Sequence, residues 1–480
     1  ATLEYRKKQS ARIGSIEAGK NIDDLAERVR MLFNSKDKAG EFLRATLAPT
    51  LVYTARITPQ IAHSIDDVDR AMRWGFGWEL GPFELIDVIG VKEVLAAAEG
   101  SPAMPPNDAK SASSGPGLGG VPPLMASLIE AGTPRFREGL VKPAAADLQI
   151  LRTAKEHDRV IKKNAGASLV DLGDGVIAVE FHSKMNAIGG DTVQMLQQGV
   201  KEAAKSGQAL VIGNDAPNFS AGANLMLVLL EAQEGNWDEI DMMIRAFQQA
   251  TMSLRYSPVP VVAAPAGLAL GGGTEIPLHC DRVQAAAETY MGLVEVGVGL
   301  IPGGGGTKEM LVRAMSQLPT PGSDPLPYVS NAFETVALAK VSASGPDAQR
   351  LGYLTATDSF TMNRERLMAD AKAKALERVR EGYHVPAPRT AIPVGGESVT
   401  AALNLGVHLM WRAGRASDHD KLIGQKLAHI FGGGNVPHAT TVTEQYLLDL
   451  EREAFMSLLG EHKTLERIQH TLKTGKPLRN

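Results

Sequence analysis

The sequence predicts an α/β domain preceded by an all-α domain, and three observations support this fold class. Over residues 14–100, apolar positions recur at helical spacing. Residues 101–123 are rich in Pro, Gly and Ser, a composition typical of linkers. From residue 166, strand patterns alternate with helix patterns, which favours parallel βαβ units.

The front part of the chain shows three helical patterns. The first is expected to begin at Asn21, whose side chain can cap a helix. The second, EFLRATLAPTLVYTARI, is expected to be interrupted at Pro49, because proline lacks the N–H that a helix interior needs. The third, SIDDVDRAMRWGF, has Ser64 as its expected cap.

The later part shows the strand and helix patterns of the α/β domain. Segments 176–181 (VIAVEF), 208–213 (QALVIG) and 258–267 (PVPVVAAPAG) are apolar and are expected to be strands. Segment 191–204 (DTVQMLQQGVKEAA) is expected to be a helix between the first two of them. From about residue 331 the patterns are helical again to the end.

These patterns predict four regions along the chain. A helical domain is expected over residues 1–100, and a linker with short helices over residues 101–165. The α/β core is expected over residues 166–330, and its C-terminal helical part over residues 331–480.

The composition excludes several classes of function. A net charge of −4 gives no basic surface for nucleic acid, and no apolar run reaches the roughly 18 residues of a membrane span. The single cysteine, Cys280, rules out an intramolecular disulfide and suits a reducing cytoplasm. His182, His279 and His408 are isolated in the sequence, so we expect structural or surface histidines and no metal site.

Two glycine-rich segments imitate nucleotide-binding loops. Residues 115–120 (GPGLGG) match the dinucleotide pattern but have neither a strand before them nor a helix after them, so a linker is the better interpretation. Residues 301–310 (IPGGGGTKEM) lack the Gly-Lys-Ser/Thr ending of a phosphate loop and are expected to be a turn that leads into a helix.

The segment GLALGGGTEIPLHCD, residues 267–281, is more informative. Consecutive glycines after a strand allow backbone N–H groups to approach a ligand closely, and a helix beginning near Gly272 would add its positive end. Glu275 would then lie in the first turn. A plain helix start, with Glu275 as a partner of the helix dipole, explains this segment alone equally well.

A second acid, Glu295, lies 20 residues further on in the apolar segment MGLVEVGVGL, where an isolated carboxylate is costly to bury. Two carboxyl groups that face one cavity are a recurrent acid–base arrangement. Upstream, residues 220–223 (SAGA) offer a further tight turn after a strand. The combination indicates a catalytic site.

At these residues the sequence resembles the crotonase (enoyl-CoA hydratase/isomerase) superfamily. Four segments match in order over residues 182–307: HSKMNAI, NFSAGANL, GLALGGGTEIPLHCD and MGLVEVGVGLIPGGGGT. The similarity continues more weakly from about residue 166 to the end. The resemblance implies a crotonase-like core of ββα units wound into a superhelix, with C-terminal helices.

The resemblance also implies roles for individual residues. The backbone N–H groups of Ala223 and Gly272 would form the oxyanion hole, and Glu275 and Glu295 would be the catalytic acids, with Glu295 as the proton donor and Glu275 holding the water. Asn224 departs from the family, which often has Asp there. The residues that the resemblance assigns to substrate or CoA are Lys184, Met185, Asn186, Ala187, Asn224, Lys473 and Lys476.

A second resemblance lies in the front part. Residues 65–90 (IDDVDRAMRWGFGWELGPFELIDVIG) look like the C-terminal helical domain of 3-hydroxyacyl-CoA dehydrogenases. The sequence has no glycine fingerprint of an NAD-binding domain upstream. The two resemblances together imply the C-terminal part of a bifunctional fatty-acid oxidation protein, without its NAD-binding domain.

The expected function is therefore enoyl-CoA hydratase, which adds water to 2-enoyl-CoA in fatty-acid β-oxidation. Two alternatives stay open: a 3,2-enoyl-CoA isomerase, in which one carboxylate suffices, and a non-catalytic acyl-CoA-binding module. Hydration needs no cofactor besides the CoA of the substrate, and NAD is not expected to bind. We expect an acyl-CoA thioester as the partner, no nucleic acid, a homo-oligomer, and a cytoplasmic location.

Overall fold

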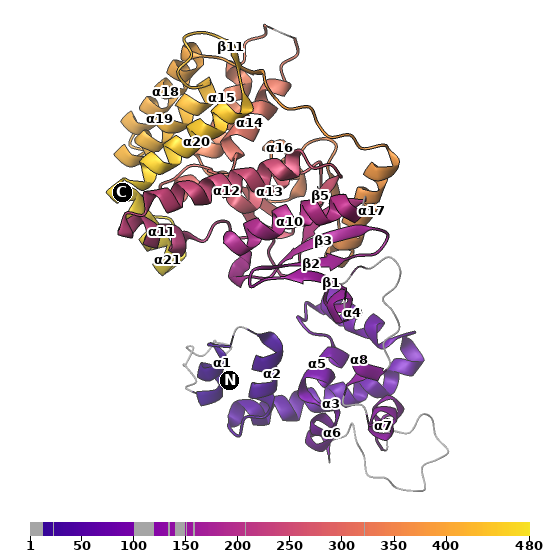
Figure 1. Ribbon diagram of the computed structural model, residues 1–480. Coiled ribbons are helices and arrows are strands. Elements are labelled where there is room, and N and C mark those ends of the chain that lie inside the picture. Colours follow the sequence, from indigo (N-terminus) through magenta and orange to yellow (C-terminus); the bar gives the residue numbers. More distant parts are fainter. Residues whose placement is uncertain are drawn as a thin grey trace. The chain divides into compact units, whose positions relative to one another are not determined.

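The structure is a computed structural model of the 480-residue chain, and it divides into two compact units, Ala1–Pro143 and Ala144–Asn480 (Figure 1). It describes residues 13–22, 24–99, 120–132, 135–139, 149, 151–156, 159–206, 208–320 and 322–480. Most of the expected linker, with all of GPGLGG except Gly120, lies outside the described residues.

The described part of the first unit is helical and has its own core. Apolar side chains from different helices meet there, among them Phe33, Leu51, Ile86 and Met125. The rings of Phe83 and Phe136 pack edge to face, with centroids 5.0 Å apart. Its helices are α1 (Gly14–Gly19), α2 (Leu25–Phe33), α3 (Lys38–Ile61), α4 (Ile65–Phe76), α5 (Pro82–Ile89), α6 (Val91–Ala98), α7 (Pro123–Glu130) and α8 (Phe136–Gly139).

Two of the three helix predictions for this unit need correction. Helix α2 begins after Asp24, whose side chain accepts the N–H of Glu27, so Asn21 is not the cap. Helix α3 runs unbroken through Pro49, because the burial of Leu51 and its neighbours offsets the roughly 3 kcal/mol that an interior proline costs. Ser64 caps α4 as expected.

The second unit contains a mixed sheet surrounded by helices. Its strands are β1 (Val160–Lys163), β2 (Ala167–Asp171), β3 (Val176–Phe181), β4 (Ala209–Gly213), β5 (Val261–Ala263), β6 (Gly267–Leu270), β7 (Arg282–Ala286), β8 (Thr289–Gly292), β9 (Ser359–Thr361), β10 (Ile392–Val394) and β11 (Thr440–Val442). Its α-helices are α9 (Leu151–Glu156), α10 (Gly190–Ser206), α11 (Leu225–Glu234), α12 (Trp237–Arg255), α13 (Gly272–Leu278), α14 (Gly306–Ser316), α15 (Leu326–Ala337), α16 (Gly345–Arg350), α17 (Leu367–Arg380), α18 (Glu397–Arg412), α19 (Asp418–Gly432), α20 (Glu444–Leu459) and α21 (His462–Thr474). Three short 3-10 helices complete it: η1 (Lys184–Asn186), η2 (Glu295–Val298) and η3 (Arg364–Arg366).

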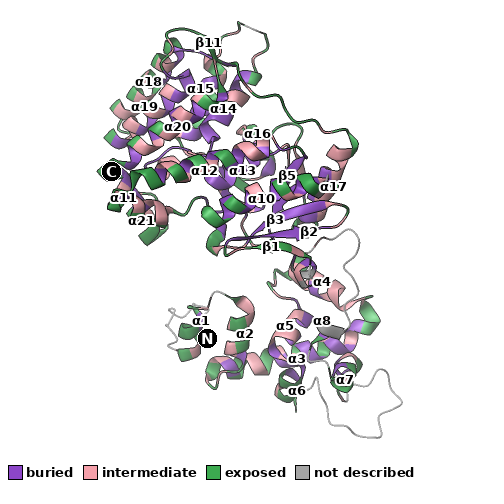
Figure 2. Ribbon diagram, viewed as in Figure 1, coloured by how far each residue is buried: buried purple, intermediate pink, exposed green. Residues whose placement is uncertain are grey.

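The main sheet has seven strands in the order β1-β2-β3-β4-β5-β7-β9. The first three strands pair antiparallel, and from β3 onward the pairs are parallel. The central strands are buried on both faces, which explains their continuous apolar sequences (Figure 2). Along β4, Leu210 packs toward the cluster that holds α10, and Val211 toward the cluster that holds α17.

The predicted strands and helices of this unit are confirmed. VIAVEF coincides with β3, while QALVIG and PVPVVAAPAG contain β4 and β5, and the expected helix between the first two is α10. The described chain after β9 is mainly helical, with α20 and α21 separated at Gly460. The four predicted region boundaries stay predictions; the division between the two units falls after Pro143.

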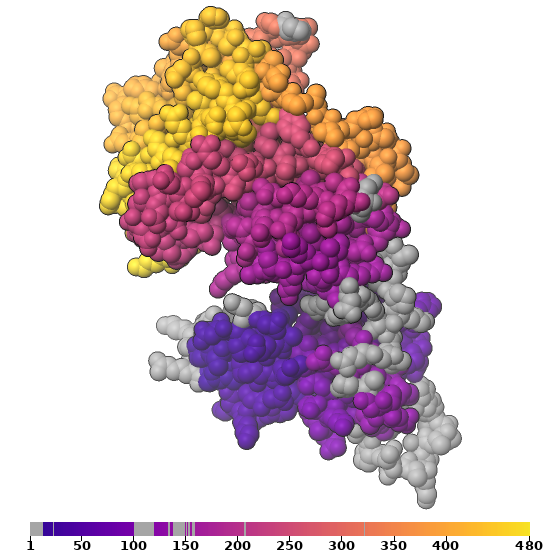
Figure 3. All heavy atoms as spheres, viewed as in Figure 1, coloured from indigo at the N-terminus to yellow at the C-terminus, as the bar shows by residue number. Residues whose placement is uncertain are grey.

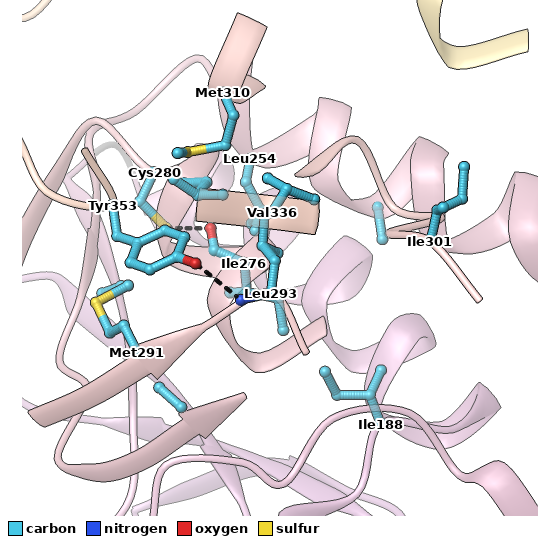
Figure 4. Close-up of a cluster of buried hydrophobic side chains, with 14 of the residues drawn as sticks. Ile188, Leu254, Ile276, Cys280, Met291, Leu293, Ile301, Met310, Val336 and Tyr353 are labelled. Atoms are coloured by element: carbon cyan, nitrogen blue, oxygen red, sulfur yellow. Dashed lines mark hydrogen bonds between the residues drawn. The ribbon is translucent and has the colours of Figure 1, made fainter. Parts of the chain in front are cut away.

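Two short parallel strands outside the main sheet, β6 and β8, position the turns of the candidate site. The N–H of Gly271, just after β6, donates to the carbonyl of Gly292 at the end of β8. Beneath them lies an apolar cluster that includes Ile276, Met291 and Leu293 (Figure 4). The hydroxyl of Tyr353 accepts the N–H of Leu293 at 3.3 Å and donates to the carbonyl of Lys340 at 2.8 Å. The ends of β6 and β8 are therefore held together and supported by this apolar cluster.

The isolated residues of the sequence have ordinary structural partners. Cys280 is buried, which raises the pKa of its thiol, and His182 shares a hydrogen bond with Ser168. Among the described residues, no His, Cys, Asp and Glu side chains group in threes as a metal ion requires. No described helix has the length and apolar composition that crossing a membrane would take.

Candidate active site

Two glycine turns meet at the ends of β6 and of the segment 220–223. Ser220 forms a bridge with Ala269, and the N–H of Leu270 donates to the carbonyl of Ser220. A Cβ on Gly222 would lie 2.9 Å from the carbonyl oxygen of Leu270, closer than real side chains approach. Gly271 has φ 55° and ψ −124°, a conformation essentially restricted to glycine. The glycines at these turns therefore allow a close approach that no other residue permits.

The residue after each of these glycines carries an uncommitted backbone N–H. Neither the N–H of Ala223 nor that of Gly272 donates to any atom of the residues that the structure describes. Gly272 begins α13, so its N–H lies at the positive end of that helix. The pair of donors that the sequence predicted for an oxyanion hole therefore lies on adjacent turns, available to a ligand.

Glu275 lies in the first turn of α13 and is buried. Its Oε1 atom accepts the N–H groups of Gly304 and Gly306, each at 2.8 Å. Burial raises the pKa of Glu275 to about 7, while those two N–H groups and the Lys308 ammonium act in the opposite direction. No described residue donates to its other oxygen, Oε2.

Glu295 begins η2, three residues after β8. Its Oε2 atom is buried and has no hydrogen-bond partner among the described residues. Burial raises the pKa of Glu295 well above its usual value, and the negative charges of Glu275 and Glu451 raise it further. A Cβ on Gly271 would lie 3.1 Å from Oε1 of Glu295, so this carboxyl group lies against the glycine turn. The structure thus brings both predicted acids to one site.

A third buried acid, Glu451 on α20, was not predicted. Its Oε2 atom accepts the N–H of Gly305 at 2.9 Å, and its Oε1 atom accepts the N–H of Lys308 at 2.5 Å. Burial and the charge of Glu275 raise the pKa of Glu451 to about 8. The glycine segment expected to be a turn before a helix does lead into α14, and its N–H groups bind these two carboxyl groups.

A buried cation supports the site from behind. The Lys308 ammonium donates to Nε2 of His279 at 2.9 Å, to Glu309 at 2.7 Å and to Glu444 at 2.9 Å. Burial and the Lys308 charge hold the pKa of His279 well below its usual value, so its ring is neutral and Nδ1 can donate to the carbonyl of Glu275 at 2.7 Å. Sequence reasoning missed this cluster, because Lys308 and Glu309 look like the polar start of an ordinary helix.

The predicted CoA-contact segment lies next to the turn at residues 220–223. The N–H of Ala221 donates to the carbonyl of Met185 at 3.1 Å, and the hydroxyl of Ser220 donates to the carbonyl of Asn186 at 2.7 Å. Met185 and Asn186 both have φ near 50°, an uncommon conformation for residues with side chains. Lys184 and Met185 are exposed, Asn186 is buried, and Ala187 is half-buried.

The other residues assigned to substrate lie further out. The side chain of Asn224 caps α11 by accepting the N–H of Leu227, so the departure from the family keeps a cap there. Lys473 and Lys476 are exposed at the end of α21, which packs against η2 and α11. In Figure 3 the C-terminal residues, in yellow, border the rose-coloured segment of the chain. The C-terminal helix is thus a neighbour of the turn that carries Glu295.

Comparisons with known proteins agree with the two resemblances. Residues 171–317 match the family described as enoyl-CoA hydratase/isomerase. Residues 40–139 match the 3-hydroxyacyl-CoA dehydrogenase C-terminal domain.

Among curated relatives, a probable 3-hydroxyacyl-CoA dehydrogenase of Bacillus subtilis is 43% identical over all of this chain and 60% of its own length. A putative fatty acid oxidation complex trifunctional enzyme of Rickettsia felis is 27% identical over 94% of this chain and 57% of its own length. This chain therefore spans about 60% of the length of these relatives. A solved enoyl-CoA hydratase from Bacillus halodurans aligns with a TM-score of 0.43 at 17% identity, over 63% of this chain and 98% of its own.

Proposed function

We propose that this chain, which joins a 3-hydroxyacyl-CoA dehydrogenase C-terminal domain to a crotonase-type domain of the enoyl-CoA hydratase/isomerase family, is an enoyl-CoA hydratase. The crotonase family and the fatty-acid oxidation relatives support an enzyme that acts on CoA esters. The observation that carries the finer proposal is the pair of buried, electrostatically coupled carboxyl groups, Glu275 and Glu295, beside two uncommitted N–H donors.

The N–H groups of Ala223 and Gly272 would bind the thioester oxygen of 2-enoyl-CoA. Addition of water places oxygen on Cβ and drives electrons toward that thioester oxygen, which becomes enolate-like. Donors already in place stabilise this charge without reorganising, and the loss of one typically costs about 3 kcal/mol of the barrier. The strict need for glycine at residues 222 and 271 supports this role, because both residues precede a donor.

Glu275 would hold the water and accept its proton, while Glu295 would give a proton to Cα. The pKa values support this division: that of Glu275 lies near neutrality, and that of Glu295 is raised further by the charge of its neighbour. Near pH 7, part of the Glu275 population is therefore ionised while Glu295 keeps its proton. Product release leaves Glu275 protonated and Glu295 ionised, and one proton transfer between them, through water, restores the pair.

Binding of the CoA part is proposed for Lys184–Ala187, Asn224, Lys473 and Lys476. The exposed Lys184 and Met185 lie on a turn with uncommon backbone angles, next to residues 220–223. This position supports contact with a ligand there. Lys473 and Lys476 carry exposed positive charge near η2, suited to phosphate groups. We further propose that this chain binds no NAD, forms a homo-oligomer and works in the cytoplasm.

The test is an assay of 2-enoyl-CoA hydration with Glu275→Gln and Glu295→Gln. Each variant keeps the size of the side chain but removes its acid–base function, so each should lower kcat by roughly 10²–10⁴-fold. The exposed Glu288→Gln is the matched control and should retain full activity. Unchanged hydration in both site variants would contradict the proposal.

The same assay separates the alternatives. Conversion of 3-enoyl-CoA to 2-enoyl-CoA without formation of 3-hydroxyacyl-CoA would establish an isomerase. Tight binding of a saturated acyl-CoA with no turnover of either enoyl substrate would establish a binding module. Hydration that proceeds equally with and without NAD, with no reduction of NAD, is the expected result.

A further inference from the structure

Glu451 lies about 150 residues from the glycine segment that it contacts, in the middle of α20. We propose that Glu451 is a positioning residue for Glu275: it holds the segment 303–308 so that the N–H groups of Gly304 and Gly306 point at the Glu275 carboxyl group. This inference rests on the proposed function of Glu275.

The hydrogen bonds of the segment divide between the two acids. Glu275 takes the N–H groups of Gly304 and Gly306 on one oxygen, at 2.8 Å each. Glu451 takes those of Gly305 and Lys308, one on each oxygen. The donors that go to the two acids therefore alternate from Gly304 to Gly306. Without Glu451, the N–H groups of Gly305 and Lys308 would be buried without an acceptor, and the segment would turn to satisfy them.

The carbonyl groups of the same segment are held from another helix, α12. The amide of Gln248 donates to the carbonyl of Gly303 at 3.0 Å and to the carbonyl of Leu448 on α20 at 2.9 Å. The hydroxyl of Thr251 donates to the carbonyl of Gly304 at 2.9 Å. These bonds fix where the segment lies, while Glu451 is bonded to the N–H of Gly305, between the two that reach Glu275, and to the N–H of Lys308 after them.

The charge of Glu451 acts on the site as well. Glu451 lies close enough to Glu295 to raise the pKa of Glu295. The charge of Glu275 in turn raises the pKa of Glu451. The charged group on α14 that faces it is Lys308, whose ammonium is directed to Glu309 and Glu444. Within the described residues, Glu451 has no ion-pair partner. Because burial raises its pKa to about 8, its carboxyl group is mainly neutral near pH 7, and its negative charge acts on Glu295 at alkaline pH.

The experiment compares Glu451→Gln, Glu451→Asp and the exposed Glu453→Gln on the same helix. Glutamine presents only one acceptor oxygen, so one of the two bonds is lost. We expect kcat for 2-enoyl-CoA hydration to fall about 10²-fold with KM unchanged, because Glu275 is displaced from the water that it holds. The alkaline limb of the pH profile should move to lower pH, since Glu295 loses a neighbouring negative charge. Glu451→Asp should recover part of kcat, and Glu453→Gln should match the unmodified chain.

Amide hydrogen exchange of residues 303–308 gives a readout that does not need activity. It should become at least tenfold faster in Glu451→Gln and stay unchanged in Glu453→Gln. If the unmodified chain hydrates no enoyl-CoA, the proposed function fails, while faster exchange in Glu451→Gln alone would still show that Glu451 holds the segment. Unchanged exchange in Glu451→Gln, or a kcat that stays constant per folded molecule, would overturn the inference.

Discussion

The two units bury acidic side chains in opposite ways. In the helical unit, Asp69 is buried and Asp87 half-buried beside Arg137, with ion-pair distances of 2.5 Å and 3.0 Å. In the larger unit, Glu275 and Glu451 are buried with only backbone N–H groups as donors, and none of the ion pairs among the described residues includes them or Glu295.

This difference separates a structural cluster from the proposed catalytic one. Asp69 accepts the N–H of Phe83, and a Cβ on Gly81 would collide with its carboxyl group, so Arg137 and this carboxyl group fix the start of α5. A carboxyl group bonded to a fixed cation cannot easily exchange protons with a ligand. Glu275 and Glu295 lack such a cation, and their protons are free for chemistry. Packing and this ion pair thus explain residues 81–87 (GPFELID), a part of the segment 65–90 that resembles the dehydrogenase domain.

The largest expected effect on this comparison comes from replacing Arg137. Replacement by Met should destabilise the helical unit by about 3–5 kcal/mol, because the buried Asp69 and the half-buried Asp87 would lose their cation. Urea unfolding followed by Trp74 and Trp78 fluorescence, in a chain with Trp237 and Trp411 changed to Phe, measures this unit.

Adding Asp69→Asn and Asp87→Asn to Arg137→Met should recover much of the lost stability, because none of the three positions then carries a charge. Equal stability of the single and triple variants would show that Arg137 acts through packing alone. The hydration proposed for the larger unit should not change in either variant.

A smaller effect concerns the stability of the larger unit against pH. The pKa of Glu275 is raised from 4.5 to about 7 in the folded state, so folding favours its protonated form. The unfolded state loses this proton first, and the free energy of unfolding therefore falls as pH rises from about 4.5 to 7. The fall due to Glu275 is about 3 kcal/mol and should be absent in Glu275→Gln.

The measurement is urea unfolding between pH 4.5 and 8, followed by Trp237 and Trp411 fluorescence in a chain with Trp74 and Trp78 changed to Phe. Glu288→Gln serves as the control and should keep the full pH dependence. A Glu275→Gln variant with the same pH dependence as the control would mean that Glu275 is ionised throughout.

The smallest expected effect concerns the exposed start of α11, which contrasts with the buried start of α13. Asn224→Ala should destabilise the larger unit by about 1 kcal/mol, because α11 loses its cap. Asn224→Asp keeps the cap and adds a charge that the helix dipole favours, so stability should rise by roughly 0.3–1 kcal/mol. Thermal unfolding measures both, and a fall in stability with Asp would show that a nearby negative charge outweighs the dipole.

The fold and part of the site could be predicted because their causes are local. Strand β3 is a continuous apolar run, and Ser64 caps α4 by contacts within one helical turn. Glu295 could be predicted as a site residue because its neighbours in the sequence are apolar, and an apolar segment indicates burial. The continuity of α3 through Pro49 could not be predicted in this way, because it depends on packing against other helices.

Glu451 shows what the sequence does not predict about the site. At helical spacing Glu451 falls on the same face as Leu448, Ala454 and Leu458, whereas Glu453 falls on the exposed face. That spacing predicts a buried position for Glu451, but it does not predict which groups the carboxyl group contacts. Its burial results from the packing of α20 against α14 and α12. Lys308 is concealed in the same way, since a lysine in the first turn of a helix is ordinary until the fold surrounds it with acids. The partners of such residues are recognised only in three dimensions.

The long span between the glycine segment and α20 also has a consequence for the order of folding. The bond from Gly305 to Glu451 joins residues 146 apart, and Gln248 bonds to Leu448 across 200 positions. During synthesis, a ribosome would have made β6, α13 and both proposed catalytic acids long before α20 emerged. The nascent chain would therefore carry those acids with part of their support still missing, and docking of α20 would complete the site as one of the last steps of folding.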